Sequence, residues 1–279
     1  MSDAELTERL GVPIITPLAR PHSTDGRFGF TWLMGTPAWR HTSHSFGFIP
    51  ADASANEKIR SVGEIAADPM LRHATLRISL DGLRIADYPG GGTHRVLFNF
   101  FVQNRTDTGV EDVNFNATYR VREGSSAAVL NYPIFFGVNP TDAGLVIRCF
   151  TVNVKNDVDE SFLNLLESET FKVGLRLATI AQPAIAPLSS LAIGMTKAIA
   201  ERHRNVPVQD VYLGLDFGGA KSGARLALGT YIAVQMPEAF QRSWRWSDWT
   251  YDTHTGQIVN ADGQLMPLNY FMIGISQTS

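Results

Sequence analysis

Cysteine is nearly absent from this sequence, and a long apolar run and an excess of charge are missing as well. The single cysteine, Cys149, excludes an internal disulfide and a thiolate metal cluster, so a reducing, cytoplasmic location is expected. The net charge of −3 disfavours nucleic acid as a partner, because no overall field draws the chain to a polyanion. Pro183 and Pro187 interrupt the longest apolar stretch, which falls short of the roughly 20 apolar residues that span a bilayer.

Motifs of known catalytic sites are also missing. No Gly-x-Ser-x-Gly pattern is present, and Cys149 lies in a strand-like stretch where a buried, inert thiol is expected. Residues 218–222 differ from a phosphate-binding loop, because Ala220 separates the glycines from Lys221. The sequence therefore gives no support for an enzyme, and a hydrolase whose site is assembled from distant residues remains an alternative.

Strand patterns dominate what is present. Val113, Phe115, Ala117, Tyr119 and Val121 alternate with polar residues, which predicts a strand with one face in the core and one in water. Further strands are expected at 76–85, 96–102, 129–138, 145–154, 208–217, 225–235 and 268–275, with 208–217 and 225–235 paired as a hairpin. The predicted fold is a mainly antiparallel β-sandwich of about eight to ten strands.

One segment, residues 157–205, has a helical period instead. Leu188, Leu191, Met195 and Ile199 recur at steps of three or four residues after Pro187, which predicts an α-helical insertion. Residues 71–279 would then form the sandwich domain with this insertion. Residues 1–70 would form an N-terminal arm and an aromatic-rich extension packed on the core.

In architecture alone, this pattern of strands resembles a C2-type sandwich. The resemblance implies phospholipid binding, often through calcium held by aspartates in loops at one end of the sandwich. A membrane- or phospholipid-binding protein that inserts through residues 171–200 is therefore an alternative function.

An acidic turn at the start of the predicted insertion contains Asp157, Asp159 and Glu160. Oxygen ligands at alternate positions suit a calcium ion. The same carboxylates would also cap the helix that follows, and this interpretation is favoured because no EF-hand glycine is present. No other cofactor is expected.

Two histidines, His41 and His44, are spaced three residues apart. That spacing suits one metal ion, but zinc needs a third protein ligand and no donor lies nearby. We expect ordinary surface histidines.

A cluster of tryptophans and arginines is the strongest candidate for a ligand or partner surface. Stacking and cation–π contacts make such side chains suitable for binding, although core packing is the competing interpretation. Its residues are Trp244, Arg245, Trp246 and Trp249, with Trp39 and Arg40 as a second patch. The preferred function is a non-enzymatic binding or assembly module with a protein partner or self-association.

Overall fold

Alternating apolar side chains build three β-sheets, two large and one small. The structure is a computed structural model, and it describes residues 38–54, 56–107, 109–126, 129, 131–155, 198–199, 201, 205–218 and 223–278. In these residues no α-helix reaches seven residues, and the strand pairs are antiparallel except for the short pair of β10 with β11. The mainly β, largely antiparallel fold predicted from the sequence is confirmed.

The larger sheet contains strands from both ends of the described chain. Its order is β3 (Arg60–Ser61), β1 (Ser43–Pro50), β12 (Gly229–Met236), β15 (Tyr270–Gln277), β4 (Leu76–Ile85) and β7 (Ser125–Ser126), and β8 (Tyr132–Val138) also pairs with β4. Residues 43–50, inside the predicted N-terminal extension, are therefore an internal strand of this sheet. The predicted domain boundary near residue 70 stays a prediction.

The second sheet has five strands and includes the longest hairpin of the fold. Its order is β11 (Ala224–Arg225), β10 (Val206–Asp216), β9 (Gly144–Val154), β5 (Thr93–Thr106) and β6 (Gly109–Arg122). Because β10 pairs with β9 while β12 lies in the other sheet, the predicted hairpin between residues 208–217 and 225–235 is wrong.

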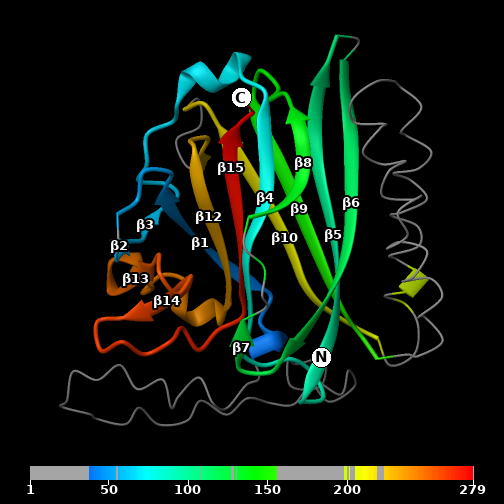
Figure 1. Cartoon of the computed structure of the whole chain (residues 1–279), viewed down its shortest axis with the longest axis vertical. Helices are drawn as coiled ribbons and strands as arrows, with labels where there is room; N and C mark the ends of the chain where they lie inside the picture. The colour runs from blue at the N-terminus through cyan, green and yellow to red at the C-terminus, as the bar shows by residue number, and fades with distance from the viewer. Residues whose placement is uncertain are drawn as a thin grey trace, which may run out of the picture. The chain divides into compact units, whose positions relative to one another are not determined.

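The two large sheets pack on one hydrophobic core (Figure 1). Phe98 of β5 is fully buried, and its ring meets that of Phe271 of β15 edge-on, with centroids 6.1 Å apart. The same ring stacks on Phe100 at 5.4 Å. Aromatic contacts of this kind add to the area buried, so Phe98 joins the two sheets at the centre of the core.

A small sheet covers the outer face of the seven-stranded sheet. It contains β14 (Gln257–Asn260), β13 (Trp249–Asp252) and β2 (Glu57–Lys58), and the 3-10 helix η7 (Trp246–Asp248) precedes β13. A Cβ atom added to Gly47 of β1 would lie 2.7 Å from Ile59 and 2.8 Å from Trp246. Glycine at this position therefore lets the indole of Trp246 approach the backbone of β1 closely.

The outer face of the five-stranded sheet is also covered in part. Leu97, Val152 and Val154 form a buried apolar cluster with Ile199, which lies about 100 positions further along the chain than Leu97. On the same face Asn114 and Asn116 are only 1% and 2% exposed. The prediction that the polar face of β6 meets water is wrong at these two asparagines.

The predicted helical insertion, residues 157–205, lies outside the described residues except for 198–199, 201 and 205. Asn205 lies at its end, where its side-chain amide donates a hydrogen bond to the carbonyl of Ile199 at 2.8 Å. The side-chain oxygen of Asn205 accepts a hydrogen bond from the backbone N–H of Lys155 at 2.9 Å. Asn205 thus ties the chain that enters β10 to the end of β9.

Candidate functional site

A glycine turn connects the two large sheets between β4 and β5. Gly90, Gly91 and Gly92 have φ values of +101°, +60° and +83°, a region that side chains with a Cβ atom rarely adopt. A Cβ at Gly90 would also collide with the ammonium group of Lys155, which lies directly against the turn. The positive φ values favour glycine at all three positions, and at Gly90 the missing Cβ also leaves room for Lys155.

The chain that leads into the glycine turn is held by a buried amide. Asn269 is fully buried, and its side-chain oxygen accepts hydrogen bonds from the backbone N–H groups of Ala86 and Asp87 at 2.8 and 3.1 Å. Its side-chain nitrogen donates to the carbonyl of Asp87 and to the side-chain oxygen of Gln235. These bonds satisfy polar groups inside the protein, so the start of the turn has a fixed position.

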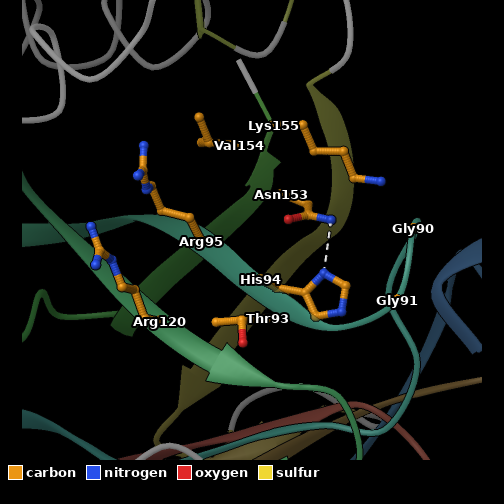
Figure 2. Close-up of a pocket in the computed structure, with 9 residues that line it drawn as sticks. All are labelled: Gly90, Gly91, Thr93, His94, Arg95, Arg120, Asn153, Val154 and Lys155. Carbon is orange, nitrogen blue, oxygen red and sulfur yellow. Dashed lines mark hydrogen bonds between the residues drawn. The ribbon is translucent and has the colours of Figure 1, made fainter. Parts of the chain in front are cut away.

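A buried histidine follows the turn, and its neighbours determine its tautomer (Figure 2). The side-chain nitrogen of Asn153 donates to the carbonyl of Pro89 at 3.0 Å and lies 3.2 Å from Nδ1 of His94. Because an amide nitrogen can only donate, Nδ1 is the acceptor, and the neutral ring carries its proton on Nε2. That N–H points toward the carboxylate of Glu123, with 3.8 Å between Nε2 and Oε2.

Burial keeps the His94 ring neutral. The side chain is 2% exposed, and its desolvation lowers the pKa below the usual 6.5. Glu123 opposes this shift and the charge of Lys155 adds to it. Nε2 has no hydrogen-bond partner in the described residues, although Glu123 is close. His94 is therefore a neutral residue whose buried N–H is directed at Glu123.

Cationic side chains from β5, β6 and the residue after β9 line a pocket of about 440 Å³, called the basic pocket below. Lys155 lies on the side of His94, whereas Arg95 and Arg120 point to the opposite face of the sheet, because successive side chains of a strand alternate. Arg95 of β5 is paired with Arg120 of the neighbouring strand β6. On the other edge of β5, Arg95 is paired with Val154 of β9. In Figure 2 the two arginines lie to the left of His94, and Lys155 lies above it. The described lining residues are Gly90, Gly91, Thr93, His94, Arg95, Arg120, Asn153, Val154 and Lys155.

The charge of the basic pocket is opposite to that of the whole chain. Arg95, Arg120 and Lys155 are cationic, while Glu123 is the acidic group placed beside His94. Neither Arg120 nor Lys155 has an ion-pair partner in the described part of the chain. Because low-dielectric walls strengthen a local field, the charges of Arg120 and Lys155 attract anions even though the chain carries a net charge of −3.

The predicted tryptophan cluster is mainly a packing feature. Trp246 and Trp249 are 6% and 4% exposed, and Trp244 stacks on Trp249 with ring centroids 5.6 Å apart. Trp244 is half-buried and Arg245 is exposed, so only these two residues of the cluster offer a surface. Whether that surface binds a partner stays a prediction.

The second predicted patch lies on the other face of the seven-stranded sheet. Trp39, in the 3-10 helix η2 (Ala38–Arg40), packs on the main core, whereas Trp246 lies on the outer face at Gly47. The guanidinium of Arg40 lies 5.2 Å from the centre of the Trp39 ring. The structure therefore does not bring Trp39 and Arg40 together with the Trp244 cluster into one surface.

The structure tests only some of the predictions about metal ligands. Asp157, Asp159 and Glu160 lie outside the described residues, so calcium binding there stays a prediction. In the described part of the chain no group of three His, Cys, Asp or Glu residues is placed to hold a metal ion. His41 and His44 are not ordinary surface histidines, because the Nε2 atoms of both are buried without a hydrogen-bond partner.

Sequence reasoning missed the basic pocket. Its residues His94, Arg120 and Lys155 are far apart in sequence, and only the strand register places β5, β6 and the end of β9 side by side. The signal that was present is the run of three glycines followed at once by a histidine. Such a run allows a ligand to approach the backbone closely.

Comparisons with known proteins give no relative. No family model matches the chain, no curated protein matches it, and no solved structure matches the fold. A search of the helices in the described residues found no segment long and apolar enough to cross a membrane. Residues 171–200, which the sequence suggested as a membrane-inserting segment, lie outside the described residues apart from 198–199.

Proposed function

We propose that this protein is a non-enzymatic binding module that holds an anionic group of its ligand in the basic pocket. The observation that carries the proposal is the ammonium group of Lys155 against the glycine turn at Gly90, in a pocket whose described lining also includes Arg120. Hydrogen bonds from charged donors to a phosphate or carboxylate are about twice as strong as neutral ones.

Inorganic phosphate is the simplest probe of this proposal. Isothermal titration should show phosphate binding to the full chain, and an equal ionic strength of sodium chloride should not reproduce the heat. The variant Lys155→Gln removes the ammonium group at the glycine turn. Because a hydrogen bond to a charged group contributes about 1.5–3 kcal/mol, the variant should bind phosphate about tenfold more weakly or worse.

Lys58→Gln is the matched control. Lys58 is an exposed lysine of β2 in the small sheet and does not line the basic pocket. It removes the same charge and should leave phosphate affinity unchanged. Equal phosphate binding by wild type and Lys155→Gln, or no binding by either, would refute the proposal.

A C2-type sandwich is the finer fold class that we propose, and phospholipid binding is the second candidate function. The two large sheets around one core support a sandwich, and a lipid phosphate would suit the same cationic side chains. Sedimentation with anionic but not neutral vesicles, lost in Lys155→Gln, would favour this candidate. Calcium at Asp157, Asp159 and Glu160 would be tested by adding a chelator to the same assay.

A protein partner or self-association remains part of the proposed binding role. The exposed Arg245 and the half-buried Trp244 are the parts of the tryptophan cluster that support it. Sedimentation velocity over a range of concentrations is the test. A constant monomer mass would remove self-association, and Arg245→Gln should weaken any association that is found.

A hydrolase is the least supported alternative. Thr93 is the hydroxyl side chain and His94 the base among the described lining residues. Successive side chains of a strand point to opposite faces, so the Thr93 hydroxyl points away from the imidazole. We therefore expect no turnover in a broad screen of ester, amide and phosphate substrates.

A further inference from the structure

We propose that His94 and Asn153 form a pH-sensitive latch on the glycine turn, and that acid opens this latch at Pro89. The latch goes beyond the proposed function, because it concerns the position of the turn and not the ligand. It depends on the hydrogen bonds that join these three residues and on the contacts that hold the rest of the turn.

Asn153 has one allowed orientation while the His94 ring is neutral. Its side-chain nitrogen lies 3.0 Å from the carbonyl oxygen of Pro89 and 3.2 Å from Nδ1 of His94. Both neighbours are acceptors, so both N–H groups of the amide are used. If the amide were turned round, its oxygen would face the Pro89 carbonyl, and two acceptors would meet in the protein interior.

A second proton on His94 is incompatible with this orientation. The neutral ring carries its proton on Nε2, so a proton taken from acidic water goes to Nδ1 and makes that nitrogen a donor. Nδ1–H then faces an N–H of Asn153, a residue that is 1% exposed. The amide must turn to present its oxygen to the charged ring, and the carbonyl of Pro89 then loses its hydrogen bond.

Charged groups near the ring determine where on the pH scale this happens. Burial, the largest effect, and the charge of Lys155 lower the pKa of His94 below 6.5, and Glu123 opposes them. Tyr88 also contacts the ring, with centroids 5.6 Å apart, but burial raises the pKa of its phenol, so that group stays neutral in acid. The latch is therefore closed at neutral pH and opens only in acid.

The other contacts of the turn confine the movement to its middle. Asn269 holds the chain that enters the turn. At the exit, the carbonyl of Gly92 accepts a hydrogen bond from the backbone N–H of Glu123 at 2.8 Å. Neither contact involves the imidazole. Acid therefore moves the part between them, where the ammonium group of Lys155 lies against Gly90.

An NMR titration of the full chain, without phosphate, tests the latch. At neutral pH the ring nitrogen signals of His94 should show a neutral imidazole with its proton on Nε2. As the pH falls below 6.5, the amide signals of Gly90 and Gly91 should shift along the same titration curve as the ring. The amide signal of Gly263, in an exposed turn after β14, should not follow that curve.

Two variants separate the latch from a general effect of acid. Asn153→Asp has no N–H to donate to Pro89, so its Gly90 signal at neutral pH should already lie near the position that wild type reaches in acid. His94→Gln removes the titrating ring, so its Gly90 signal should stay constant over the same pH range. His73→Gln, which removes an exposed histidine, is the matched control and should titrate as wild type does.

The wild-type titration decides even if a variant fails to fold. If the ring of His94 takes up a proton while the Gly90 and Gly91 signals do not move, the latch is wrong and the proposed function stands. A neutral ring with its proton on Nδ1 would also overturn the latch. Unfolding of the whole chain before the ring is protonated would overturn it as well, because the latch requires a folded state in acid.

Discussion

His44 should make the protein lose stability in mild acid, and the size of this effect follows from its surroundings. The residue lies on β1 opposite Gln235, and its Nε2 atom is buried without a hydrogen-bond partner. Desolvation lowers the pKa of His44 to about 4, against smaller opposing effects of Asp210 and a backbone hydrogen bond at Thr42. Protonation of the folded protein therefore needs a more acidic solution than protonation of the unfolded chain.

The sign and magnitude follow from linkage. Between pH 6.5 and about 4 the unfolded chain binds a proton at His44 that the folded protein does not, so stability falls as the pH falls. Each pKa unit corresponds to about 1.4 kcal/mol, so the loss over this window is about 3 kcal/mol at most. Above the unfolded pKa of 6.5 the His44 contribution is fully present.

Urea denaturation of wild type and His44→Gln, measured at several pH values from neutral to about 4, checks this reasoning. The free energy of unfolding of wild type should fall by about 3 kcal/mol more than that of the variant. His73→Gln, which removes an exposed histidine, is the control and should follow the wild-type curve. Parallel curves for wild type and His44→Gln would refute the argument that the buried ring resists protonation.

Three further experiments test the fold. Phe98→Ala should lower the free energy of unfolding by about 3–5 kcal/mol, because this fully buried ring contacts Phe271 of the other sheet; a loss below about 1 kcal/mol in urea denaturation would contradict its central position. Gly47→Ala should cost about 1–3 kcal/mol and shift tryptophan fluorescence, because the new methyl group would lie 2.8 Å from Trp246. An unchanged spectrum and midpoint would show that the indole is not seated there. Cys149 should resist thiol reagents until urea unfolds the chain, because burial raises the pKa of its thiol; fast labelling of the native protein would disprove this burial.

Short-range patterns predicted the strands well. Val113, Phe115 and Val121 of β6 are buried in the main core, as their alternation predicted. The pattern failed on the opposite face, where Asn114 is 1% exposed. A polar side chain indicates a solvent-exposed face only when no other part of the chain covers that face. Near Leu97 the face is covered by Ile199, which is far along the chain.

Pairing between strands was beyond the reach of local sequence. The glycines near residue 218 favoured a hairpin, yet β10 and β12 belong to different sheets. Partners of strands depend on contacts that span long stretches of chain, and turn residues do not determine them. The same limit hid the basic pocket, because the residues that line it come from β5, β6 and the end of β9, which only the strand register places side by side.

The tryptophan cluster was predicted as a binding surface from its residue types. Its side chains Trp246 and Trp249 are buried, so they cannot contact a partner. Tryptophans beside arginines are typical of interfaces, but Trp246 is 6% exposed and lies on Gly47. The sequence contained no sign of the space that Gly47 leaves for the indole. Glycine in a strand indicates a close approach only once the neighbouring element is known.

A crystal structure of the full chain with phosphate is the most direct test of the basic pocket. The account predicts a phosphate at the Lys155 ammonium beside Gly90. Crystals in which phosphate is bound elsewhere, while the space beside the Lys155 ammonium holds only water, would contradict it.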